Sequence, residues 1–254
     1  MKTFVNKNIL ITGGSRGIGK ALALSLKRQG ANIAIFSRSI EQEADTSFCD
    51  IAINCDVSNQ HEQQAAFDQL KEQWQHLDGC FINAGVSGFS SILDMPLDEY
   101  DRVLNINLRA AFISLQEAGR WMKSSLSHHN VAGSIVACCS LSSFAPENHI
   151  AHYNMAKSAL AMLVKTAARE FGHFNTTVNG VAPGLTHTDL IAGSEAIPGF
   201  HERVSKRTAL GRIGEVEDIV PEIEHLLLSR WVTGQVLVAD GGLSLFTPTD
   251  PLEN

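Results

Sequence analysis

The chain has 254 residues, 44% of them hydrophobic, and its 27 acidic and 20 basic side chains give a formal net charge of −7. This length suits one large α/β domain, and the composition excludes a disordered or fibrous protein. An acidic chain without a Lys/Arg cluster is repelled by nucleic acid and by anionic membranes, so we expect neither as a partner, and no apolar run reaches the roughly 18 residues of a membrane span.

Short apolar runs alternate with amphipathic stretches along the chain. The apolar runs predict seven strands, at Asn8–Thr12, Asn32–Phe36, Ile51–Cys55, Gly79–Asn83, Gly133–Cys139, Thr177–Val181 and Gln235–Ala239. The amphipathic stretches predict helices at Ile18–Gln29, Asn59–Gln75, Leu97–Met122, Tyr153–Phe171 and Val216–Ser229. Apolar strands that alternate with helices are typical of a parallel sheet covered on both faces. We therefore expect the α/β class: a single doubly wound Rossmann domain over residues 1–246, with a seven-stranded, mainly parallel sheet, and a C-terminal tail at 247–254.

A glycine-rich turn, Thr12-Gly-Gly-Ser-Arg-Gly-Ile-Gly19, joins the first predicted strand to the first predicted helix. Glycine permits a tight turn and lets a pyrophosphate approach the backbone N–H groups of a helix N-terminus. An ordinary strand–helix turn is the alternative, but the position at the start of a βαβ unit favours dinucleotide binding. No Gly-Lys-Ser/Thr follows, so a P-loop enzyme is not supported. The candidate cofactor contacts in this turn are Gly13, Ser15, Arg16, Gly17, Ile18 and Gly19.

The spacing Thr-Gly-x-x-x-Gly-x-Gly resembles the cofactor motif of the short-chain dehydrogenase/reductase family, and the resemblance extends over nearly the whole chain. Further motifs match in order: Cys55-Asp56-Val57, Asn83-Ala-Gly85, Asn107-Leu108, Ser140 with Tyr153-x-x-x-Lys157, Pro183-Gly184 with Thr188, and Thr233-Gly234 through Gly241-Gly242. The resemblance implies a nicotinamide-dependent oxidoreductase, nearest in motif detail to the 3-oxoacyl-carrier-protein reductases. It implies that Asn107 anchors a water linking Lys157 to solvent. It also implies cofactor contacts at Asp56, Val57, Asn83, Ala84, Gly85, Tyr153, Lys157, Pro183, Gly184, Thr186 and Thr188.

Tyr153 and Lys157 are four residues apart on a predicted helix and therefore share a face. Free tyrosine has a pKa near 10 and is a poor base at neutral pH. The ammonium group of Lys157, together with an oxidised nicotinamide, is expected to lower the pKa of Tyr153, and the same pair can return a proton to a carbonyl. Ser140 can hold the substrate oxygen. The set predicts acid–base catalysis of hydride transfer, with an unrelated surface Tyr/Lys pair as the alternative.

The end of the second strand indicates which cofactor binds. Ser37 stands where the resemblance implies an aspartate in NAD-dependent relatives, and a carboxylate there would repel the 2′-phosphate of NADP. Arg38 and Arg16 can both approach that phosphate, so the sequence favours NADP, the alternative being that both arginines merely face solvent. Seventeen residues separate Arg38 from Asp56. The helix after the second strand is therefore expected to be short or absent.

The histidines and cysteines lack the spacing of a metal site. Neither His61-Glu62 nor His201-Glu202 continues as His-Glu-x-x-His, and no cysteines are spaced as Cys-x-x-Cys. Cys138-Cys139 should point to opposite faces of a strand and are interpreted as packing residues, and His128-His129 are predicted to lie in a surface loop. Five cysteines, an odd number in mostly apolar surroundings, and no signal-peptide pattern predict a reduced, cytoplasmic protein without a bound metal.

Substrate contacts are expected from the loops after the strands, at Val86, Ser142, Asn148 and Leu185, with Ser87 and Leu141 as further candidates. The segment Leu190–Arg207 mixes glycine, proline and apolar residues, as a mobile lid would, and it favours a mostly apolar, small to medium ketone or secondary alcohol. A 3-oxoacyl-thioester reductase is the second interpretation. It is weakened because Ser124–Ser134 has no Lys or Arg, and Phe171–Asn179 offers only His173, for docking an acidic carrier. A non-catalytic NADP-binding regulator is a third, although Ser140, Tyr153 and Lys157 are all present.

Two predicted helices are apolar on more than the side that faces the sheet, which indicates a second partner. The residues concerned are Ala110, Ala111, Ile113, Leu115 and Ala118 on the first, and Ala159, Leu160, Met162, Leu163 and Ala167 on the second. The family resemblance implies that these helices pair between subunits. We expect a homo-oligomer, a dimer or a homotetramer; alanine placed for helix propensity alone is the alternative.

Overall fold

The computed structural model describes residues 3–38, 40, 46–129 and 132–245. Seven strands form one sheet in the order β3-β2-β1-β4-β5-β6-β7, and every pairing is parallel. They are β1 (Asn8–Thr12), β2 (Asn32–Ser37), β3 (Ile51–Asn54), β4 (Gly79–Ile82), β5 (Ser134–Cys138), β6 (Thr177–Pro183) and β7 (Val236–Ala239). The predicted doubly wound α/β fold is confirmed. The boundary at residue 246 and the tail lie outside the described residues.

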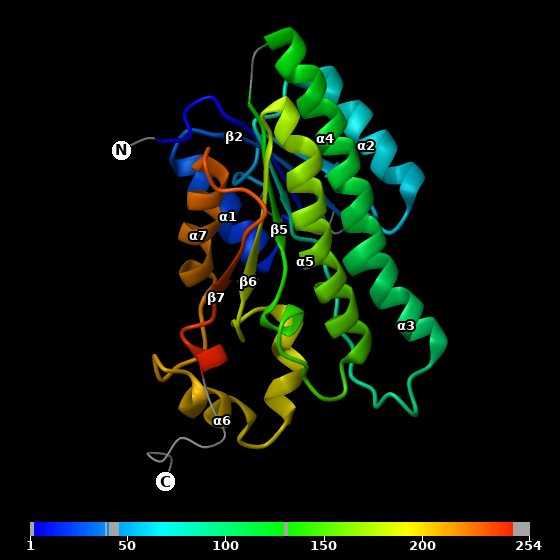
Figure 1. The fold of residues 1–254 in the computed structure, drawn as a ribbon, viewed down its shortest axis with the longest axis vertical. Coiled ribbons are helices and arrows are strands. Elements are labelled where there is room, and N and C mark those ends of the chain that lie inside the picture. The colour runs from blue at the N-terminus through cyan, green and yellow to red at the C-terminus, as the bar shows by residue number, and fades with distance from the viewer. Residues whose placement is uncertain (1–2, 39, 41–45, 130–131, 246–254) are drawn as a thin grey trace.

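Helices cover both faces of this sheet (Figure 1). On one face lie α1 (Gly17–Arg28) and α7 (Val216–Leu228), and on the other lie α2 (Gln60–Gln73), α4 (Ala110–His129) and α5 (Ala151–Phe171). Each face has its own hydrophobic core. Because side chains alternate along a strand, Ile9 and Ile11 of β1 pack in the core under α1 and α7, and Leu10 packs in the core under α2, α4 and α5. Cys138 and Cys139 divide between the same two cores, as predicted.

The helix predicted at Leu97–Met122 is interrupted. It consists of α3 (Leu97–Leu104), a π-helical turn at Asn105–Arg109, and α4, which continues to His129. The carbonyl of Val103 accepts a 3.0 Å hydrogen bond from the Asn107 side-chain amide, which ties the π-helical turn to the last turn of α3. The loop predicted at His128-His129 is wrong, because no glycine or proline ends the helix before that point.

Residues 189–207 cross the carboxyl ends of the strands, at the bottom of Figure 1. A 3₁₀ segment (Asp189–Ala196) and the short helix α6 (Phe200–Arg207) build this region. Its mobility stays a prediction. Between β2 and β3 the described residues 38, 40 and 46–50 contain no α-helix; the other residues of this connection lie outside the described ones, so the short or absent helix expected there stays a prediction. No described helix is both long and apolar enough to cross a membrane.

Candidate active site

The predicted site residues gather at one edge of the sheet. Since all strands are parallel, their carboxyl ends meet there, and the segments that follow β1, β4, β5 and β6 are neighbours. These segments carry the glycine-rich turn, Asn83–Gly85, Ser140 and Pro183–Thr188. The sheet order therefore brings motifs far apart in sequence into one region.

The glycine-rich turn fits a dinucleotide pyrophosphate. Gly13 and Gly17 have φ of 64° and 54°, in the left-handed region that favours glycine. A Cβ on Gly13 would lie 2.9 Å from the Cα of Ala84, and one on Gly19 would lie 2.6 Å from the carbonyl oxygen of Gly13. The N-cap residue of α1, Arg16, makes no side-chain capping bond, and the first turn has no acidic residue. The amino end of α1 is thus suited to an anionic group.

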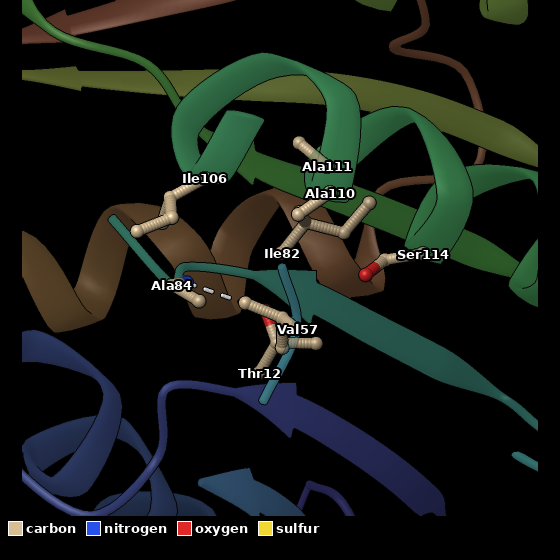
Figure 2. A pocket seen from close by; sticks show the side chains of 8 residues that line it. All are labelled: Thr12, Val57, Ile82, Ala84, Ile106, Ala110, Ala111 and Ser114. Carbon is tan, nitrogen blue, oxygen red and sulfur yellow. Dashed lines mark hydrogen bonds between the residues drawn. The ribbon is translucent and has the colours of Figure 1, made fainter. Parts of the chain in front are cut away.

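Thr12 fastens the turn to the segment after β4. Its Oγ1 accepts bonds from the backbone N–H groups of Asn83 (3.0 Å) and Ala84 (3.3 Å), while the Asn83 side-chain amide donates to the carbonyl of Gly13 at 3.0 Å. Thr12 was not among the predicted site residues, although its place at the head of the motif was the available signal. Thr12 is among the side chains that line a small pocket (Figure 2), which has no room for a water molecule. The other lining residues are Val57, Ile82, Ala84, Ile106, Ala110, Ala111 and Ser114.

The groups expected to select NADP lie at the end of β2 and in the glycine-rich turn. The hydroxyls of Ser15 and Ser37 are 2.8 Å apart. Arg38 Nη1 lies 3.7 Å from Asp56 Oδ2, and Arg16 Nη1 lies 3.5 Å from Asp189 Oδ2. The arginines thus face different carboxylates here, and both side chains are more than half exposed. Partial burial works to raise the pKa of Asp56, but hydrogen bonds from Ser58 and the charge of Arg38 outweigh it and lower that pKa.

Tyr153 and Lys157 lie in the first two turns of α5, both buried. The Nζ of Lys157 is 5.5 Å from the centre of the Tyr153 ring and donates a 2.7 Å hydrogen bond to the carbonyl of Cys138. Burial raises the pKa of Tyr153, and this outweighs the opposing effects of Lys157 and of a hydrogen bond with Ser140. Lys157 thus acts in the predicted direction, whereas the lowering of the Tyr153 pKa with an oxidised nicotinamide bound stays a prediction; the sequence did not reveal how deeply the phenol is buried.

Asn107 projects from the π-helical turn and is almost wholly buried. Its Oδ1 accepts from the backbone N–H of Val86 at 3.1 Å, and its amide donates to the Val86 carbonyl at 2.7 Å. A Cβ on Gly85 would lie 2.7 Å from the Asn107 oxygen and 3.7 Å from Lys157 Nζ. Asn107 thus fixes the chain after β4, and its role as a water anchor stays a prediction.

The predicted substrate residues are unequally placed. Ser142 is buried beside Ser140, with their hydroxyl oxygens 3.2 Å apart. Leu185 is half-buried, and its carbonyl accepts from the N–H of Gly214 at 3.0 Å. Asn148 lies in an exposed loop. The neighbouring Glu147, which was not among the predicted site residues, accepts a 2.8 Å hydrogen bond from Ser142 Oγ.

Within the described ranges, no three or more His, Cys, Asp or Glu side chains are grouped so that they could hold a metal ion. The five cysteines are free thiols. Burial raises the pKa of Cys55, Cys80 and Cys139 to about 12. These three thiols are therefore poor nucleophiles and poor metal ligands at neutral pH.

Known proteins resemble the whole chain. A family model described as Enoyl-(Acyl carrier protein) reductase matches residues 13–244. An L-rhamnose 1-dehydrogenase (NAD(P)(+)) of Azotobacter vinelandii is 32% identical over 252 residues, covering 94% of this chain and 97% of the relative. Carbonyl reductase family member 4 of Xenopus laevis is 32% identical over 244 residues, 95% of this chain and 99% of its own. The crystal structure of a gluconate 5-dehydrogenase from Burkholderia cenocepacia, in complex with NADP and tartrate, superposes with a TM-score of 0.90 at 29% identity, covering 97% of this chain and 98% of the other.

Proposed function

The chain belongs to the short-chain dehydrogenase/reductase family, and from this premise we propose that it is an NADP(H)-dependent oxidoreductase acting on a ketone or secondary alcohol. The observation that carries the proposal is one arrangement of side chains. Tyr153 is buried beside Lys157 and Ser140, at the sheet edge where the glycine-rich turn also lies. An unrelated surface pair would not be desolvated in this way.

The side chains divide the acid–base work. When bound, the nicotinamide supplies or accepts the hydride. In the reducing direction the Tyr153 hydroxyl donates its proton to the carbonyl oxygen, and the raised pKa of Tyr153 keeps that proton in place at neutral pH. Ser140 donates a hydrogen bond to the same oxygen and orients it. Lys157, held by the Cys138 carbonyl, stabilises the phenolate that remains.

We propose NADP rather than NAD because Ser37, instead of a carboxylate, ends β2 and two arginines lie nearby. Relatives named for both NAD and NADP, and an NADP-bound relative, support the broader cofactor class. Within the family, the proposed cofactor contacts are those predicted from sequence, with Thr12 as a residue that positions them.

A small free ketone or alcohol is the proposed substrate. Relatives named for L-rhamnose and gluconate support a hydroxylated compound, in place of the mostly apolar one expected from residues 190–207. An acyl-thioester reductase is the second candidate, favoured by the name of the matching family model.

A homotetramer in the cytoplasm completes the proposal. The exposed Phe112, Met155 and Met162 on α4 and α5 support subunit contacts there.

The test is a panel assay. NADPH oxidation is followed with ketones and with a 3-oxoacyl thioester, and NADP reduction with secondary alcohols and aldoses, with Tyr153→Phe beside wild type. We expect turnover of at least one free ketone or alcohol, and a loss of about 10²–10⁴ in kcat for Tyr153→Phe with NADPH affinity kept. Wild type that binds NADPH but turns over nothing would favour the regulator. A variant that keeps a tenth of the activity would refute the role of Tyr153.

A further inference from the structure

The loop between β5 and α5 carries a charge that the reaction above does not use. Glu147 is the only Asp, Glu, Lys or Arg between Ser140 and Tyr153. Its Oε1 accepts a 2.8 Å hydrogen bond from Ser142 Oγ, which lies 3.2 Å from Ser140 Oγ. One buried serine therefore separates this carboxylate from the hydroxyl that, on our proposal, holds the substrate oxygen.

The loop that carries Glu147 is held from two sides. The Asn154 side-chain amide on α5 donates to the carbonyl of Glu147 at 2.8 Å. The N–H of Ser90, in the segment between β4 and α3, donates to the carbonyl of His149 at 2.7 Å. His149 has a φ of 64°, which is strained for a residue with a side chain and persists only where the surroundings fix it. These contacts fix the conformation in which Glu147 reaches Ser142.

Glu147 is exposed, and most of the hydrogen-bonding capacity of its carboxylate is left to water. An ionised carboxylate only accepts hydrogen bonds and has about four lone-pair sites, of which Ser142 occupies one. In the part of the chain that the structure describes, no Lys, Arg or His forms an ion pair with Glu147. Its charge also reaches Tyr153, where it adds to the larger effect of burial in raising the pKa of the phenol. A ligand that covers Glu147 must therefore bring donors, or the carboxylate loses water without replacement.

We propose that Glu147 determines substrate specificity by accepting a hydrogen bond from a hydroxyl beside the reacting carbon. It thereby selects neutral vicinal polyols and hydroxyketones, since an apolar neighbour leaves the carboxylate unsatisfied and a carboxylate neighbour is repelled. This inference rests on the proposed function, because Glu147 is linked through Ser142 to Ser140, the residue proposed to hold the substrate oxygen. It differs from the mostly apolar substrate predicted from the sequence.

Three alcohols on one ring test the inference: cyclohexanol, cyclohexane-1,2-diol and 2-hydroxycyclohexane-1-carboxylate. The kcat/KM of each with NADP is measured for wild type, Glu147→Gln and Glu147→Ala. If the ring alcohols are not turned over, their inhibition constants against the best alcohol of the panel replace kcat/KM. Asp94→Ala is the matched control, because Asp94 accepts a hydrogen bond from Ser91 in the neighbouring β4–α3 segment without contact to Ser140 or Ser142. Melting temperatures verify that all variants fold.

Wild type is expected to prefer the diol to cyclohexanol by about tenfold or more, the value of one hydrogen bond to a charged group. Glu147→Ala should reduce this ratio to near one while the kcat/KM for cyclohexanol changes little. Of the three alcohols, 2-hydroxycyclohexane-1-carboxylate should gain most in kcat/KM from Glu147→Gln. Asp94→Ala should leave the ratios unchanged. A wild-type ratio near one, or a ratio that Glu147→Ala does not change, would overturn the inference. Failure of the proposed function is a different result: wild type would turn over no member of either panel.

Discussion

Exchanging the residues at the end of β2 should change which cofactor binds. In the wild-type chain the hydroxyls of Ser15 and Ser37 are 2.8 Å apart, so Ser37→Asp places a carboxylate beside the Ser15 hydroxyl. Arg38→Ile removes a guanidinium group whose side chain is 58% exposed. A hydrogen bond to a charged group contributes about 1.5–3 kcal/mol, so loss of the Arg38 contact alone weakens NADPH binding by about 10- to 150-fold. The introduced carboxylate acts in the same direction through repulsion, whereas NADH has no 2′-phosphate to lose.

Binding without turnover gives the cleanest measurement of this change. Dissociation constants for NADPH and NADH are determined by calorimetry on wild type, the double variant and Lys27→Ile. Lys27 lies in the last turn of α1, at the opposite end of that helix from the glycine-rich turn, and pairs with Asp50. Its loss therefore removes one positive charge, as the loss of Arg38 does, but away from the cofactor site. The control should keep the wild-type preference for NADPH. Equal binding of the two cofactors by wild type, or an unchanged ratio in the double variant, would refute our interpretation of Ser37 and Arg38.

Three further predictions concern Lys157, the thiols and assembly. Lys157→Ala should weaken NADPH binding as well as lower kcat, because its buried ammonium also anchors the carbonyl of Cys138; unchanged affinity in titration would argue against the double role. Alkylation at pH 8, followed by mass spectrometry, should leave Cys80 and Cys139 unmodified until the protein is denatured. The reason is that a pKa of about 12 leaves about one thiol in ten thousand ionised at this pH. Rapid labelling of either thiol in the native protein would contradict the described burial. Light scattering should give the mass of a dimer or tetramer, and Met162→Lys, at a side chain 60% exposed on α5, should reduce it; a single-chain mass that stays constant on concentration would rule out the interface.

The sequence predicted the sheet and the convergence of the candidate site residues well, because both depend on local patterns. Apolar runs and turn glycines located every strand to within two residues at either end. Motif spacing alone grouped Ser140, Tyr153 and Lys157, since the ends of parallel strands converge whatever the details of packing.

Features that depend on three-dimensional packing could not be predicted in this way. Most of the apolar residues assigned to a subunit contact, such as Ala118 and Leu160, are buried inside the chain, and Met162 is the main exception. The depth of Tyr153, the π-helical turn and the approach of Glu147 to Ser142 likewise depend on contacts between segments distant in sequence or on loop geometry. Periodicity shows that a helix is apolar on a face but does not identify what covers that face.

The π-helical turn has a consequence for how this region tolerates change in length. A π-turn contains about one residue more than an α-turn, and one residue corresponds to about 100° of rotation about the helix axis. The extra residue is accommodated within the turn, so α4 keeps the phase that directs Ala111, Leu115 and Ala118 into the core. Deleting a single residue from Asn105–Arg109 would convert the π-turn into an α-turn and rotate the buried stripe of α4 only a little. It would, however, displace Asn107 from both backbone groups of Val86, so that one missing residue would disturb the edge of the active site while the packing of α4 is largely kept.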